Sequence, residues 1–174
     1  MLYNISTMKK RYRLPKEQKD FFFKEIKKII YNEEYLKLKN YYHHGTISTY
    51  THAIKVTYLA YCFAVKHNIK LDHRELIRAA LLHDLYFYDW HKQGKGIHLH
   101  GLFHPKRAVK NAQRLFSITK NEKRHMAHHM FPLTLIPPTT KAGWIICLCD
   151  KLAARSDYKA LKLKKNVTKS LSSR

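Results

Sequence analysis

Residues 72–84 read DHRELIRAALLHD, and this stretch predicts a helix through Leu82 that is followed directly by a histidine–aspartate pair. Asp72 suits the N-cap position of that helix, and Glu75 three residues later completes a capping box. His83 follows apolar residues at spacings of four and seven, so its side chain shares their inward face. We therefore expect an imidazole and the adjacent carboxylate of Asp84 at the edge of a helical core.

Two further residues of the same chemical types occupy inward positions on other predicted helices. His52 lies four residues before Val56 and seven before Leu59. Asp150 follows Ile146 by four residues on the last apolar helix. Burying a carboxylate is costly unless a cation pairs with it, and imidazoles and carboxylates together suit ions such as Zn, Fe(II) and Mn. Any one of these side chains alone is explained as a hydrogen-bonded core residue or a surface charge pair, but the ordered set predicts a metal site.

The composition favours a helical globule. Hydrophobic residues make up 45% of the 174 residues, and only five Gly and five Pro are present for the many turns of an all-β fold. No apolar run approaches the roughly 18 residues of a membrane span. The N-terminus has no apolar signal-peptide core, so we expect a cytoplasmic location. The three cysteines lie in apolar helical stretches and are expected to be reduced, buried thiols.

We predict an all-α, single-domain bundle of about six helices at residues 16–158, between a basic N-terminal arm at 1–15 and a basic C-terminal tail at 159–174. His104 would cap the helix that begins at Pro105, and Asn121 would cap the following short helix. The expected helices span about residues 17–39, 49–67, 72–82, 105–116, 121–129 and 142–158.

The formal charge of +22, from 34 Lys and Arg against 12 acids, is extreme for a chain of this length. Such a field attracts polyanions, namely nucleotides, RNA or anionic lipid, so weak binding of nucleic acid is one expectation. An anionic, phosphate-containing small molecule fits the same field, although the charge does not identify it. The alternative is a lysine-rich solvated surface, because no single stripe of the sequence concentrates the charge.

The order of His52, His83-Asp84 and Asp150 resembles the HD superfamily of metal-dependent phosphohydrolases. The resemblance covers about residues 43–156 and is closer to a bacterial group of single-domain HD proteins. The segments that carry it are HHGTISTYTHAIKV (43–56), LLHDLYFYDWH (81–91), HGLFHPKRAVKNA (100–112), HHMFPLT (128–134) and WIICLCDK (144–151).

The resemblance implies a helical fold with one divalent ion held by His52, His83, Asp84 and Asp150. HD proteins with two ions add histidines between the His-Asp pair and the last Asp. This chain has His104 there and the adjacent pair His128 and His129, of which we prefer His129; Asp84 would then bridge the ions. The cofactor is therefore expected to be one or two divalent ions among Fe, Mn, Zn, Mg, Co and Ni.

Other polar residues are predicted to support the reaction. Asp84 and Asp89 are the predicted catalytic residues, and Asp89 would act as a general acid or base. A cap of a helix end or loop explains Asp89 equally well. Four further residues are candidate substrate contacts, namely His44, Arg107, His128 and Lys151. The alternative explanation is a turn at His44 and a solvated helix lysine at Lys151. His91, His98 and His100 lie in the same glycine-containing loop as Asp89.

The sequence as a whole predicts a hydrolase that cleaves a phosphoester or phosphoanhydride in a nucleotide-like substrate through a metal-activated water. Two alternatives stay open from the residues alone. One is a nucleic-acid-binding protein on an HD scaffold, and the other is a di-iron HD oxygenase. The binding protein predicts salt-sensitive binding of RNA or DNA without phosphatase activity. The oxygenase predicts iron-dependent consumption of dioxygen and no reaction with phosphoesters.

Overall fold

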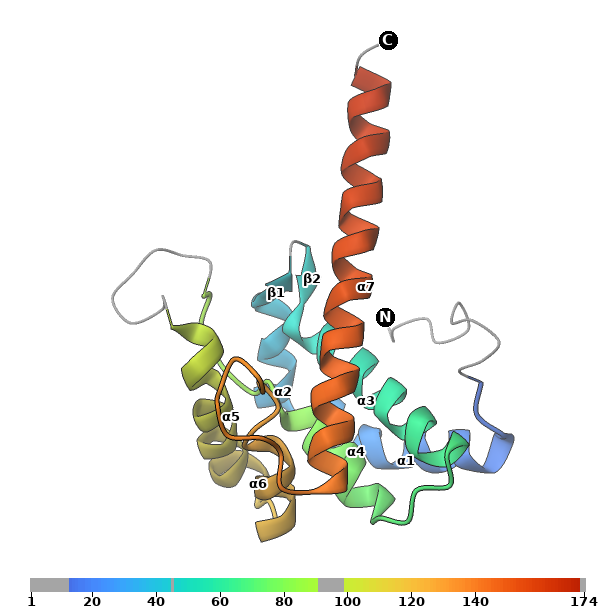
Figure 1. The fold of residues 1–174 in the computed structure, drawn as a ribbon, viewed down its shortest axis with the longest axis vertical. Helices are drawn as coiled ribbons and strands as arrows, with labels where there is room; N and C mark the ends of the chain where they lie inside the picture. Colours follow the sequence, from blue (N-terminus) through green and yellow to red (C-terminus); the bar gives the residue numbers. More distant parts are fainter. Residues whose placement is uncertain (1–12, 45, 91–98, 173–174) are drawn as a thin grey trace.

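Helix α3, Thr49–Lys66, lies at the centre of the fold and packs against α4, His73–Leu82, and α7, Lys141–Ser172 (Figure 1). Most side chains of α3 are buried, as expected for the inner helix of a bundle. This arrangement is seen in a computed structural model, which describes residues 13–44, 46–90 and 99–172. The predicted all-α class is confirmed.

Helix α4 begins and ends where the sequence predicts. The Asp72 carboxylate accepts hydrogen bonds from two amides of the first turn, at 2.8 and 3.0 Å. The helix ends at Leu82, so His83 and Asp84 lie in the turn that follows directly. The carboxylate of Glu75 accepts a hydrogen bond from the Thr119 hydroxyl at 2.8 Å, and thereby joins α4 to the start of α6 instead of closing the predicted capping box.

The single helix predicted to reach Lys39 is wrong, because the chain folds there as three elements. Asn32 interrupts it: its side-chain oxygen accepts from two backbone amides of the next turn, at 2.9 and 3.3 Å, and starts a new helix. The elements are α1, Lys16–Ile30, α2, Glu33–Leu36, and the 3₁₀ helix η3, Lys37–Asn40.

A small hairpin precedes α3 and was not expected from the sequence. Strand β1, Tyr42–His44, pairs antiparallel with β2, Ile47–Ser48. Strands of three and two residues are too short to produce a recognisable alternation of apolar and polar residues. The hairpin matters because β1 carries a histidine into the interior.

Helix α5, His100–Phe116, begins earlier than predicted. Leu99 occupies the N-cap position and Pro105 lies inside the helix, so the prediction that His104 is the N-cap is wrong. Proline is favoured in a first turn because it lacks an amide hydrogen, and that preference suggested the later start. The added turn is held by a hydrogen bond from His104 Nδ1 to the His100 carbonyl at 3.0 Å.

The last two helices also depart from their predicted limits. Helix α6, Lys120–Met126, is capped by Thr119 and not by Asn121, and the capping box is completed by Glu122. Helix α7 continues to Ser172, past the predicted end near residue 158, because no Gly or Pro interrupts it there. Figure 1 shows its C-terminal part extending away from the other helices.

The hydrophobic core lies among α1, α3, α4 and α7, where large aliphatic and aromatic side chains are fully buried. Its members include Phe22, Ile26, Ile54, Leu76, Ile77 and Ile146. Among the helices that the structure describes, none has the length and hydropathy needed to cross a membrane.

Candidate metal centre

Six buried side chains from five segments meet near the start of α3. Each is at most 7% exposed, although all are polar or charged. They come from α3, the turn after α4, α5, the segment after α6, and α7, and they are His52, His83, Asp84, His104, His129 and Asp150. The structure thus brings together all six residues predicted as metal ligands.

One part of this cluster joins the end of α4 to α3 and α7. His52 Nε2 lies 2.9 Å from Asp150 Oδ1, and His83 Nε2 lies 3.8 Å from the same oxygen. His83 Nε2 is also 3.5 Å from Asp84 Oδ2. Ligand atoms of His52, His83 and Asp84 lie within 4.8 Å of one another, close enough for one ion.

The other part of the cluster gathers around the second oxygen of Asp84. His104 Nε2 and His129 Nε2 lie 3.1 and 3.5 Å from Asp84 Oδ1. The two Nε2 atoms are 2.8 Å apart. Ligand atoms of these three residues again lie within 4.8 Å of one another, so Asp84 belongs to two groups of possible ligands.

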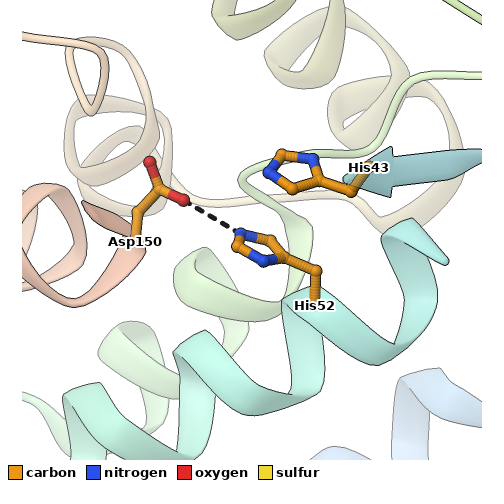
Figure 2. Close-up of side chains that lie close together, drawn as sticks. All are labelled: His43, His52 and Asp150. Carbon is orange, nitrogen blue, oxygen red and sulfur yellow. Dashed lines mark hydrogen bonds and ion pairs between the residues drawn. The ribbon is translucent and has the colours of Figure 1, made fainter. Parts of the chain in front are cut away.

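His43, on β1, is a seventh member that the sequence prediction missed. Its ring stacks on that of His52, with centroids 3.8 Å apart, and Figure 2 shows Asp150 facing the pair from α7. His43, His52 and Asp150 form a third group of possible ligands, and His43 Nδ1 lies 3.3 Å from Asp84 Oδ2. The sequence drew attention to the neighbouring His44, because a strand of three residues is too short to leave an alternation from which His43 could have been chosen.

Backbone carbonyls determine which nitrogen of three histidines faces the cluster. The Nδ1 atoms of His83, His104 and His129 donate to the carbonyls of residues 80, 100 and 126, at 2.6, 3.0 and 2.8 Å. A carbonyl can only accept, so the proton of each neutral ring is on Nδ1 and its Nε2 carries a lone pair. The Nε2 atoms of His104 and His129 are 2.8 Å apart, so their two lone pairs repel each other unless a proton or a metal ion lies close to both.

The buried charges of the cluster shift one another's ionisation. Burial alone would lower the pKa of His52, but its contacts with Asp150 and Asp157 raise that pKa to about 9. Burial would likewise raise the pKa of Asp84, but His83 and the nearby His104 ring hold it well below its usual range. The centre therefore keeps its carboxylates ionised and in need of positive charge.

Several polar atoms at the centre lack hydrogen bonds, which fits the binding of a cation. Among the described residues, His83 Nε2 and both carboxylate oxygens of Asp84 are buried and make no hydrogen bond of acceptable geometry. Leaving such atoms unsatisfied is expensive, and a divalent ion satisfies lone pairs that converge in this way. Mixed imidazole and carboxylate donors are also the set that such ions use.

A cavity of about 840 Å³ adjoins the centre. Asp84, His104 and Asp150 contribute to its wall, so part of the cluster is accessible from it. The other described residues along the cavity are mostly apolar or aromatic, and they are His43, Trp90, His100, Gly101, Met130, Pro132, Leu133, Lys151 and Ala154. The cavity is large enough for a small organic molecule.

An aromatic stack leads from the centre along the cavity. The Trp90 ring stacks on the His100 ring, with 5.0 Å between the ring centroids, and the His100 ring stacks on the His104 ring, with 4.5 Å between the centroids. Lys151 lines the cavity wall, and its ammonium group donates to the His129 carbonyl at 3.1 Å. The cavity therefore places a cationic group beside the segment that carries one of the histidines.

Of the remaining predicted site residues, Asp89, Arg107 and His128 are not among the described residues that line the cavity. Asp89 is half-buried. Arg107 is exposed, with its guanidinium 4.8 Å from the centroid of the Tyr88 ring, and His128 is half-buried. The side chain of His44 and the whole of His91 and His98 lie outside the described residues.

Comparison with known proteins agrees with this geometry. A family model described as HD domain matches residues 49–155, more than half of the chain. The comparisons with curated proteins and with solved structures give no match. The matched range contains all six residues of the cluster that were predicted from the sequence, in their expected order, whereas His43 precedes it. The chain therefore belongs to the HD domain family.

Proposed function

We propose that this protein is a metal-dependent phosphohydrolase that cleaves a phosphoester or phosphoanhydride in a nucleotide-like substrate. The observation that carries the proposal is the convergence of four histidine Nε2 atoms on Asp84 and Asp150 beside a cavity. Membership of the HD domain family supports it, since metal-dependent hydrolysis is the usual activity of that family.

Two overlapping sets of residues would hold the ions. The first is His52, His83, Asp84 and Asp150, which His43 can join. The second is Asp84, His104 and His129. The carboxylate of Asp84 has one oxygen near each set, and this supports its role as the shared ligand. A donor set rich in imidazole favours Fe, Zn, Co or Ni over Mg, which prefers oxygen ligands.

Bound divalent ions would supply the positive charge that activates water and neutralises phosphoryl oxygens. The residues of this chain would contribute position and exclusion of bulk water. Asp84 and Asp150 stay ionised despite burial, so they hold cations without needing to lose protons first. Lys151 would provide a fixed positive charge beside the substrate phosphate, and Trp90 would give an aromatic surface for a base. Roles for Asp89, His44, Arg107 and His128 stay predictions.

The proposal is tested by purifying the protein anaerobically, measuring its metals by elemental analysis, and screening phosphate release from nucleotides and simple phosphoesters. We expect bound transition metal and hydrolysis that Asp84→Ala reduces by at least about a thousandfold. Full activity in Asp84→Ala would refute the hydrolase. Dioxygen consumption by the iron form without phosphate release would favour the oxygenase, and salt-sensitive RNA binding without either reaction would favour a binding protein.

A further inference from the structure

His52 differs from the other three Nε2-directed histidines of the cluster in what holds its Nδ1 atom. The other three donate from Nδ1 to a backbone carbonyl three or four residues earlier in the chain. The Nδ1 of His52 instead faces Asp157 Oδ2 at 3.3 Å, while its Nε2 faces Asp150 Oδ1 at 2.9 Å. A charged acceptor binds an N–H donor more strongly than a carbonyl does, so His52 has a distinct environment.

Asp157 reaches this position because it lies on the same face of α7 as Asp150. The two are seven residues apart, close to two helical turns, so α7 presents one carboxylate to each ring nitrogen of His52. Asp157 is only 4% exposed, and it belongs to none of the three groups of possible metal ligands found among the described residues. Its carboxylate is therefore a buried charge placed behind a ligand and not in front of it.

Lys55 supplies the opposite charge that allows Asp157 to be buried. It lies one turn after His52 on α3 and is 7% exposed. Its ammonium group contacts Asp157 Oδ1 and donates to Ser156 Oγ at 2.9 Å and to the Ala153 carbonyl at 3.4 Å. Helix α3 thus carries the ligand and the cation, and α7 carries the two carboxylates.

We propose that Asp157 is a positioning residue, which holds the His52 ring with Nε2 directed at the metal centre, and that Lys55 holds Asp157. The inference rests on the proposed function, because it assumes an ion at the His52 set. By accepting the Nδ1 proton, Asp157 places the ring lone pair on Nε2 and makes that atom a stronger donor to a metal. A buried ion pair that only joined α3 to α7 would change stability and leave metal affinity unchanged.

Titration of the metal-free, full-length protein with Co²⁺ separates these roles, because the visible absorption reports both affinity and ligand field. We expect Asp157→Asn, which keeps an acceptor oxygen, to weaken Co²⁺ binding about 10-fold, and Asp157→Ala to weaken it about 100-fold. Both variants are expected to shift the Co²⁺ absorption band, since the His52 donor is changed.

Glu122→Gln is the matched control. Glu122 is 1% exposed and forms a partly buried ion pair with Arg78, at 2.5 Å, that joins α6 to α4. Glutamine there removes a buried charge of the same kind without touching any residue of the metal centre. We expect this variant to lose stability but to keep the wild-type Co²⁺ affinity and absorption band.

Wild-type Co²⁺ affinity in Asp157→Ala, or an equal loss of affinity in Glu122→Gln, would overturn the role of Asp157. If the wild-type protein binds no Co²⁺, the metal centre of the proposed function fails, and the positioning role fails with it. Should the single variants not fold, Lys55→Met/Asp157→Asn removes both charges together. Weakened binding in that folded double variant supports the role, and unchanged binding overturns it.

Discussion

Asp84 is the residue on which the centre depends most, because its two oxygens face different groups of imidazoles. His83 Nε2 lies 3.5 Å from Oδ2, and His104 Nε2 lies 3.1 Å from Oδ1. A carboxylate that is 1% exposed is costly to bury in its ionised form unless cations lie close to its oxygens. The two sides of Asp84 are therefore expected to bind separate ions.

Replacement of His129 by alanine should remove one ion and keep the other. The ratio of metal to protein is expected to fall from about two to about one, and Asp84→Asn should bring it close to zero. Elemental analysis of protein freed of excess metal measures this ratio. His125→Ala is the control, because His125 is half-buried, bonds Thr140 at 2.9 Å and belongs to none of the ligand groups. A ratio of one in the wild-type protein that persists in His129→Ala would rule out the second ion.

Cys62 should make the protein less stable in alkali. Burial raises the pKa of its thiol to about 12, against about 8.5 in an unfolded chain, although a hydrogen bond with Tyr58 opposes the rise. The unfolded thiol therefore loses its proton first, so the stabilisation is complete below pH 8.5 and is lost as pH rises toward 12. We expect wild-type protein to lose about 1.4 kcal/mol more than Cys62→Ala between pH 7.5 and 9.5, measured by urea unfolding. Equal losses of unfolding free energy in the wild-type protein and in Cys62→Ala would contradict a raised pKa of the Cys62 thiol.

Among the elements, α6 shows how a cap decides where a helix starts. From the sequence, Asn121 was predicted to cap this helix, because asparagine is a favoured capping residue. The structure places Thr119 at the cap, where its hydroxyl accepts from the Glu122 amide at 3.0 Å and donates to Glu75 at 2.8 Å. The tertiary contact with α4 adds to the local preference and explains the earlier start.

Thr119→Ala is accordingly expected to lower the free energy of unfolding by about 1–2 kcal/mol, since it removes the cap and the bond to Glu75. Asn121→Ala should change it by less than about 0.5 kcal/mol, because Asn121 is an exposed residue inside the helix. Chemical denaturation of the two variants gives the comparison. Similar losses in both would mean that Thr119 is not the cap.

Among the described residues, helix α7 contributes to the centre through Asp150 and Asp157, which both come before residue 158. The part of α7 after residue 158 extends away from the other helices (Figure 1). A chain that stops after Tyr158 should therefore keep the metal content and the melting temperature of the full protein within about 2 °C. Thermal unfolding and elemental analysis test this limit of the domain. A large loss of either would show that residues 159–174 belong to the folded unit.

For the molecule as a whole, the centre joins segments that are distant in the sequence. His43 comes from the hairpin, His52 from α3, His104 from α5 and Asp150 from α7. Ions bound at the two sets, which share Asp84, would therefore oppose separation of these elements. Ligands that bind only the folded state stabilise it by an amount set by their concentration relative to Kd.

Removal of metal with EDTA is expected to lower the free energy of unfolding by about 2.7 kcal/mol relative to protein with free ion at 100 times its Kd. The loss should lower the melting temperature, and addition of Mn²⁺ or Zn²⁺ should restore the original melting temperature. Asp84→Ala provides the control, because its melting temperature should not respond to either treatment. A wild-type protein whose melting temperature ignores both EDTA and metal would contradict the metal centre.

Much of the centre could be predicted from the sequence, because helical periodicity is local. The spacing of His83 and Asp150 from apolar residues was sufficient to place them on inward faces, and the capping of α4 at Asp72 followed from side-chain chemistry. The order of His52, His83-Asp84 and Asp150 then indicated the family. These features depend on residues a few positions apart, which any single sequence displays.

Only the tertiary structure decided which further residues complete the centre. His43 lies on a strand too short to leave a pattern, and Asp157 becomes significant only because α7 passes alongside α3, which sets it behind His52. Helix α5 also begins at His100, before the start that Pro105 suggested, and it carries His104 into contact with Asp84 and His129 from other segments. Periodicity determines which face of a helix is buried, but the packing of helices determines which side chains of two faces meet, and that is a long-range property of the fold.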